Sequence, residues 1–122
     1  MEPEHEQAMR ADFNEVAELR HQAWRPSTPI TETNELFAQI SATNRRWLDG
    51  PHREHWQYLD DAYSDWHARP DTMARLVENV EHNRAQGYDA GMPDIEYRSQ
   101  LQAREVTEVE RARKRDRPPR QR

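Results

Sequence analysis

The sequence predicts an all-α fold: a small helical bundle around a central antiparallel helical hairpin, followed by a projecting C-terminal helix and a disordered basic tail. The main observation is a stripe of seven side chains at helical spacing within residues 52–66, with polar and acidic side chains on the opposite face. No segment alternates apolar and polar residues as a half-buried strand does. The stripe consists of His52, His55, Trp56, Leu59, Ala62, Tyr63 and Trp66.

Length and composition predict one domain with a small core. The chain has 122 residues, of which 34% are hydrophobic and 34% are charged. A core built from so few apolar residues must rely on large side chains, and a buried aromatic side chain removes roughly 150–250 Å² from water. We therefore expect the core to contain the four tryptophans, Trp24, Trp47, Trp56 and Trp66.

Several classes of protein are excluded or disfavoured by what the sequence lacks. There is no cysteine, which excludes disulfides, thiol catalysis and cysteine-based zinc sites. The first ten residues contain no apolar run of the kind found in signal peptides. No segment approaches the roughly 18 apolar residues that a membrane-spanning helix requires. These features favour a soluble, cytoplasmic protein without membrane contact.

The first predicted helix covers residues 4–24, with an apolar stripe formed by Met9, Phe13, Val16 and Ala23. It ends at a proline-rich break over residues 25–31, because proline denies the backbone a hydrogen-bond donor. Thr28 or Thr31 can cap the helix that follows.

Residues 31–67 are predicted to form the central hairpin. Its first helix covers residues 31–48, and Gly50 and Pro51 end it. The short connection to the helix at 52–66 favours antiparallel packing, which brings Trp47 close to His52, His55 and Trp56. The stripe of the first helix contains Leu36, Phe37, Ile40 and Trp47.

A fourth helix is predicted to begin at Pro70, with Asp71 as its N-cap, and to end before Gly87. Its apolar stripe consists of Met73, Leu76, Val77 and Val80. With this helix the predicted bundle extends over residues 1–93.

A fifth helix is predicted over residues 94–110, capped by Asp94. Tyr97 and Leu101 are apolar, but the next positions on the same stripe are charged: Arg104, Glu105 and Glu108. A helix that is polar on all sides is exposed to solvent or is formed on a partner. We therefore expect this helix to be exposed and to contact a partner through Tyr97 and Leu101.

Residues 111–122 are predicted to be a disordered, arginine-rich tail. Seven basic residues and one acidic residue give the tail a net charge of +6, which leaves −11 on the rest of a chain whose net charge is −5. Such a tail can bind nucleic-acid phosphates without sequence preference, contact an acidic protein, fold back on its own acidic body, or simply aid solubility. The residues expected to contact nucleic acid are Arg111, Arg113, Lys114, Arg115 and Arg117.

The outer face of residues 52–66 carries Asp60, Asp61 and Asp65. Acidic residues on a helix surface are usually an ordinary solvated face. Their alternative role is to attract a basic partner, because a cluster of one charge steers association. We retain these three residues as a predicted partner-binding face.

His52 and His55 lie one helical turn apart, which suits a shared metal ion. The motif is weak, since no acidic residue follows on the same face, and two histidines at the wet end of a hairpin are the more ordinary interpretation. The three glycines form no phosphate-binding loop, and no serine has the context of a catalytic nucleophile. We expect neither an enzyme nor a bound cofactor.

Together these features favour a small non-enzymatic helical interaction protein, a regulatory or adaptor protein. It would bind another macromolecule, most simply a protein, through the acidic face and the C-terminal helix. The alternative is a nucleic-acid accessory protein that uses the basic tail, and a histidine metal site is a weaker third hypothesis. The low apolar content makes a homodimer an alternative to a self-sufficient monomer.

Overall fold

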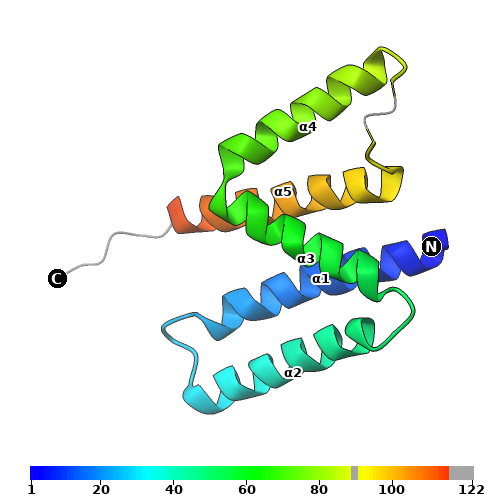
Figure 1. Cartoon of the computed structure of the whole chain (residues 1–122). Coiled ribbons are helices and arrows are strands. Elements are labelled where there is room, and N and C mark those ends of the chain that lie inside the picture. Colours follow the sequence, from blue (N-terminus) through cyan, green and yellow to red (C-terminus); the bar gives the residue numbers. More distant parts are fainter. Residues whose placement is uncertain (89–90, 116–122) are drawn as a thin grey trace. The chain divides into compact units, whose positions relative to one another are not determined.

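The computed structural model describes residues 1–88 and 91–115, and this part of the chain contains helices and no strands (Figure 1). The predicted all-α class is therefore confirmed. The helices begin and end within a few residues of their predicted bounds, except at the C-terminal end of the last one. They are α1 (Pro3–Ala23), α2 (Ile30–Leu48), α3 (Arg53–Ala68), α4 (Pro70–Ala85) and α5 (Asp94–Arg115).

The chain divides into two compact units inside α3. The first unit is Met1–Gln57 and contains α1, α2 and the first turn of α3, whereas the second unit begins at Tyr58. This division differs from the single bundle predicted over residues 1–93.

The first unit is built on an antiparallel hairpin of α1 and α2 (Figure 1). Its connection is fixed by hydroxyl groups: Thr28 donates to the carbonyl of Gln22 at 2.8 Å, and Thr33 donates to that of Pro29 at 3.1 Å. Neither predicted threonine caps α2, whose N-cap is Pro29. The buried residues of α1 are those predicted from its stripe, and α2 adds two more: Met9, Phe13, Val16, Ala23, Leu36 and Ile40.

Three aromatic rings join the beginning of α3 to this hairpin. Trp56 is buried, meets the ring of Phe13 edge-on at 5.7 Å, and stacks on Trp47 at 5.7 Å with an interplanar angle of 6°. The predicted proximity of Trp47 to the start of the third helix is confirmed. The pairing of whole helices differs from the prediction, because α2 packs along its length against α1 rather than against α3.

In the second unit, side chains from α3, α4 and α5 converge on one apolar cluster. Tyr63, Tyr97 and Leu101 pack around its rim. The predicted α4 stripe is buried except for Leu76, which is exposed. Pro70 is the first residue of α4, and the N-cap of this helix is Arg69 rather than the predicted Asp71. Gly87, two residues after the end of α4, has a φ of 83°, which suits glycine. The cluster consists of Ala62, Trp66, Met73, Val77 and Ala103.

The last helix differs most from its prediction. The segment 94–110 was expected to be exposed, but α5 buries a face made mainly of small and polar residues, and it continues to Arg115. Residues 111–115 are therefore helical rather than disordered, while 116–122 lie outside the described residues. The buried residues of α5 are Ser99, Gln100, Gln102, Ala103, Val106 and Thr107.

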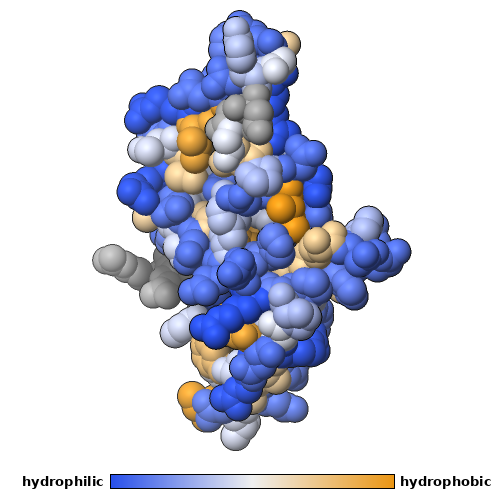
Figure 2. Space-filling view, turned by 45° about the vertical axis from the view of Figure 1, so that its right-hand side comes forward, coloured by the Kyte–Doolittle hydropathy of each residue, from blue (hydrophilic) through white to orange (hydrophobic). Residues whose placement is uncertain are grey.

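The visible surface is mostly hydrophilic, with small hydrophobic patches (Figure 2). Among the described residues, no helix combines the length and the apolar character needed to cross a membrane.

Candidate protein-interaction surface

The most exposed large apolar side chains of the first unit lie where α1 meets α2. Trp24 is 69% exposed and Ile30 is 73% exposed. The Trp24 ring and the half-buried Phe37 ring form a T-shaped pair, with centroids 5.6 Å apart and an interplanar angle of 76°. We call these three residues the Trp24 surface.

Local structure holds the Trp24 surface in place. Trp24 is the C-cap of α1, and its backbone N–H donates to the carbonyl of Arg20 at 3.1 Å. Ile30 is the first residue of α2. Both side chains therefore stand on helix ends, and the contact with Phe37 restricts the indole ring. Surfaces of this kind lose little conformational entropy on binding.

The segment around Trp24 is basic. Residues 20–31 include Arg20, His21 and Arg25 and contain no acidic residue. Arg20 and Trp24 are four residues apart on α1, which places them on the same side of the helix. The Trp24 surface thus combines exposed apolar area with adjacent positive charge.

Trp24 is predicted from the sequence to lie in the core, but in the structure its side chain is exposed. The available signal was its position: Trp24 comes directly after the last stripe residue of α1 and two residues before Pro26. A large apolar residue at such a helix end has fewer neighbours to bury it than one in mid-helix. Ile30, directly after Pro29, could have been identified in the same way.

The predicted acidic face lies on the outer side of α3. Asp60 and Asp61 are exposed, and Asp65 is half-buried. The Asp65 carboxylate accepts a hydrogen bond from the Arg69 guanidinium at 2.8 Å, which offsets part of the negative charge. The role of this face in binding a partner stays a prediction.

Tyr97 and Leu101, the predicted contact residues of the last helix, are half-buried and pack against the apolar cluster of the second unit. The Tyr97 hydroxyl donates to Glu81 Oε1 at 2.8 Å, and this hydrogen bond raises the pKa of Tyr97, with burial as the second cause. The Arg84 guanidinium lies 4.7 Å from the ring centroid. Both side chains thus take part in the protein's own packing.

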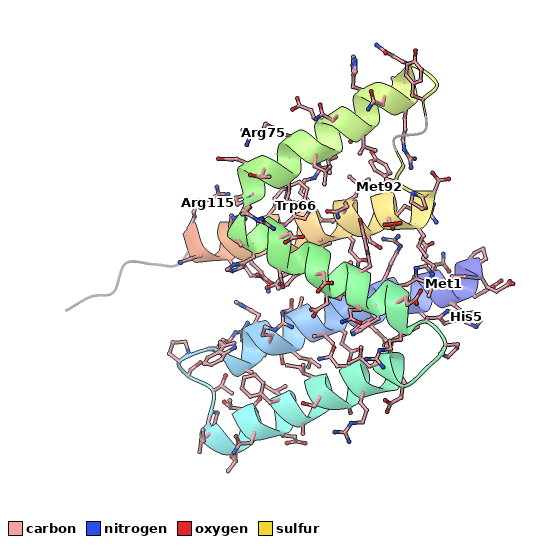
Figure 3. The ribbon with its side chains drawn as sticks, in the orientation of Figure 1. Met1, His5, Trp66, Arg75, Met92 and Arg115 are labelled. Atoms are coloured by element: carbon pink, nitrogen blue, oxygen red, sulfur yellow. The ribbon has the colours of Figure 1, made fainter. Side chains whose placement is uncertain are left out.

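A buried amide links α5 to α3. Gln100 Oε1 accepts a hydrogen bond from Trp66 Nε1 at 2.8 Å, and Gln100 Nε2 donates to the Tyr58 hydroxyl at 2.9 Å. Burial raises the pKa of Tyr58, and the hydrogen bond from Gln100 acts in the opposite direction. Figure 3 shows Trp66 near the end of α3, beside α5.

Two further contacts extend this link toward the C-terminal end of α5. The Tyr63 hydroxyl donates to the Glu110 carboxylate at 2.8 and 3.0 Å, and Arg111 donates to the backbone carbonyl of Trp66 at 2.7 Å. The Arg104 guanidinium lies 5.7 Å from the Trp66 ring centroid. We call the hydrogen bonds made by Gln100, Glu110 and Arg111 the α3–α5 seam.

The seam changes how the predicted nucleic-acid residues are interpreted. The Arg111 guanidinium donates a hydrogen bond to the backbone carbonyl of Trp66, and the Arg113 side chain is half-buried. Lys114 and Arg115 are exposed at the end of α5. Arg117 lies outside the described residues. Two of the five predicted residues are therefore exposed in the described part of the helix.

His52 and His55 are both half-buried. The closest imidazole contact of His52 is with His5, whose ring centroid lies 4.9 Å away. Within residues 1–88 and 91–115, no three His, Cys, Asp or Glu side chains lie close enough together to hold a metal ion. This geometry offers the predicted His52/His55 site no third protein ligand among those residues.

Comparison of the chain with protein-family models, with curated proteins and with solved structures finds no match.

Proposed function

We propose that the protein is a small non-enzymatic helical adaptor that binds another protein through the Trp24 surface. The observation that carries this proposal is the exposure of Trp24 and Ile30, 69% and 73%, on a chain of low apolar content. Exposed apolar patches favour binding because association removes them from water. Tryptophan is also among the residues that contribute most to the binding energy of protein interfaces.

The chemistry of the surface indicates the chemistry of the partner. An indole that projects from a helix end fits an apolar pocket, and the neighbouring Arg25 and His21 favour acidic side chains at the rim of that pocket. We therefore expect a partner with an apolar cleft and a negatively charged border. A cytoplasmic location, expected from the sequence, is part of the same proposal.

The acidic residues Asp60 and Asp61 are retained in this proposal as a steering surface for a basic region of the partner that lies apart from the acidic border of its cleft. Exposed charges change the rate of association more than its strength. Neutralising them should slow binding at low salt and have little effect on the dissociation rate.

The proposal can be tested by affinity capture from the native host with matched variants. The bait is the full chain, compared with Trp24→Ser and with Tyr88→Ser. Tyr88 is a suitable control because it is a large aromatic residue with 65% exposure in the second unit. Each captured protein is then purified, and its dissociation constant is measured with all three forms.

We expect a specific protein to bind the wild-type chain and Tyr88→Ser and to bind Trp24→Ser about 30-fold more weakly, which corresponds to a contribution of about 2 kcal/mol. Equal affinity of the three forms would contradict the proposal. Sedimentation equilibrium tests another occupant: a dimer that Trp24→Ser dissociates would show that a second copy covers the surface, and would likewise contradict binding of a different protein.

A second function, sequence-independent contact with nucleic acid, is favoured by Lys114 and Arg115, which are exposed at the end of α5. The test is a salt series with short duplex DNA and single-stranded RNA, comparing the full chain with Lys114→Ala/Arg115→Ala. This pair leaves the bond from Arg111 to Trp66 in place, whereas truncation after Glu110 would remove it. Binding by the full chain with a shallower salt dependence in the variant would support this function; absence of binding by the full chain would contradict it.

A further inference from the structure

Two histidines from different helices meet in the first unit. His5 lies in the first turn of α1, and His52 directly precedes α3. Their ring centroids are 4.9 Å apart, with an interplanar angle of 40°. Figure 3 shows His5 at the beginning of α1.

The histidine pair is connected to the aromatic junction. The ring of His52 lies 6.2 Å from that of Trp47, which stacks on Trp56. Trp47 Nε1 also donates to Asp12 of α1 at 2.7 Å. A displacement of His52 would therefore change the environment of Trp47, whose ring helps to join α3 to the α1–α2 hairpin.

The charged groups that act most strongly on His52 are cationic when protonated. They are His5 and the N-terminal amino group on the α1 side, and His55 on α3. Helix α2 contributes the neutral ring of Trp47. Burial is the largest cause that lowers the pKa of His52, and the three cationic groups lower it further.

The carboxylates on the same helical turns offset this charge only weakly. Glu6 is held by Arg10 at 2.8 Å, and Glu4 and Glu54 are exposed to solvent, which screens their charge. His52 also directly precedes the N-terminus of α3, where the aligned peptide dipoles disfavour a positive charge. The surroundings of His52 therefore favour its neutral imidazole.

We propose that His5 and His52 form a proton-sensitive contact that holds the beginning of α1 against the start of α3 when both are neutral and loosens on acidification. A positive charge on either ring weakens their contact, and a charge on both makes them repel. Acidification would thus separate the first turn of α1 from the aromatic junction. This device is independent of the Trp24 surface.

The sign of the effect follows from the two protonation states. The unfolded chain binds a proton at His52 near the ordinary value of 6.5, whereas the folded protein binds it only at lower pH. The unfolded state is thus favoured as the pH falls below 6.5, and the loss is complete below the folded-state pKa. At neutral and alkaline pH, where His52 is neutral in both states, its titration does not reduce the stability of the folded protein.

The experiment is an NMR titration of the histidine Cε1–H signals from pH 8 to pH 4.5, with EDTA present to exclude metal binding. It uses the wild-type chain, His5→Gln, His52→Gln, and His82→Gln as a control on α4 of the second unit. The indole N–H signals of Trp47 and Trp56 are followed in the same samples. Denaturant unfolding at pH 7.5 and pH 5.0 gives the folding equilibrium constants.

We expect His52 to titrate below 6.5, and the Trp47 indole signal to move with the same midpoint. His5→Gln should raise the pKa of His52, whereas His82→Gln should leave it unchanged. Between pH 7.5 and pH 5.0, the folding equilibrium constant of the wild-type chain should fall by a larger factor than that of His52→Gln. The size of the difference follows from the difference between the pKa of His52 in the folded protein and in the unfolded chain.

Two results would overturn the proposal. One is a His52 pKa at or above 6.5 in the wild-type chain, which needs no variant and so does not depend on the folding of a mutant. The other is a Trp47 signal that does not respond while His52 titrates, because the histidine charge would then leave the aromatic junction unaffected.

Discussion

The two units are held together in different ways. In the first unit, helices join mainly through aromatic rings: Trp56 lies against Phe13 and Trp47. Asp12 of α1 adds one polar link by accepting hydrogen bonds from Trp47 and Arg46 of α2. In the second unit, an apolar cluster is supplemented by the α3–α5 seam, in which Gln100 bonds to both Trp66 and Tyr58. A helix without an apolar stripe can therefore still be packed, provided its polar groups find partners on the neighbouring helix.

The energetic consequences of the two arrangements also differ. Apolar contacts are non-directional, so the cost of losing one grows with the area exposed and the cavity left behind. A buried hydrogen bond contributes little net stability while it is intact, but removing one partner leaves the other unsatisfied. The variants below test this contrast, from the largest expected effect to the smallest.

The largest effect is expected from Trp56→Ala in the first unit. This ring is 2% exposed, and truncation of a buried tryptophan costs about 3–5 kcal/mol. Trp24→Ala in the same unit should change the free energy of unfolding by less than about 0.5 kcal/mol, because its ring already faces water. Chemical denaturation measures both, and a similar loss in the two variants would mean that Trp24 is part of the core.

A smaller but substantial loss is expected from Gln100→Leu in the second unit. Leucine has a side-chain volume similar to that of glutamine, but it leaves the buried Trp66 Nε1–H without its acceptor. The free energy of unfolding should fall by about 1–3 kcal/mol. Trp66→Phe in the same background should cost less than it does alone, since both partners are then absent. Strictly additive effects in this double-mutant cycle would show that the Gln100–Trp66 hydrogen bond is not formed.

This contrast explains which parts of the fold could be predicted from the sequence. The stripe residues of α1 were identified correctly because Met9, Phe13 and Val16 are apolar and recur at helical spacing. The buried face of α5 was missed because Gln100 and Thr107 are polar, and their burial depends on partners that no local pattern reveals. Hydrophobic periodicity detects apolar faces only.

The candidate surface was missed for a related reason. Residue type predicts that tryptophan is buried, and this holds for Trp56 and Trp66 but fails for Trp24. Trp24 follows the stripe of α1 at a helix end, so its exposure is decided by how α1 and α2 meet. The packing of α1 against α2 is tertiary structure, and the apolar stripe of a single helix does not specify it.

Alkaline pH gives a second test of the seam. The pKa of Tyr58 is raised, mainly by burial, so its phenol stays neutral in the folded protein above pH 10, where the unfolded chain ionises. Stability is therefore present below pH 10 and is lost as the pH rises toward the folded-state pKa. Tyr58→Phe should lose less stability between pH 9 and pH 11 than the wild-type chain, with Tyr88→Phe as the exposed control. Equal losses in the wild-type chain and Tyr58→Phe would place Tyr58 in a solvent-like environment.

The smallest effect is expected on the surface of α3. The Asp65–Arg69 pair is 2.8 Å apart, and the side chains of Arg69 and Asp65 are 63% and 40% exposed. Exposed pairs four residues apart contribute about 0.3–0.5 kcal/mol, so Asp65→Asn should reduce stability by no more than that at low salt. A loss above 1 kcal/mol in denaturant unfolding would indicate that Asp65 has a structural role beyond this pair.

The central claim is that α5 is packed into the folded second unit through the α3–α5 seam, so that the Trp24 surface rather than α5 is the proposed binding surface. Hydrogen–deuterium exchange of the isolated chain tests this most directly. We predict that the backbone amides of residues 99–107 are protected to a degree similar to those of residues 59–66 on α3. Exchange of residues 99–107 at nearly the rate of an unstructured chain would contradict the account and would restore the interpretation of α5 as a helix that forms only on a partner.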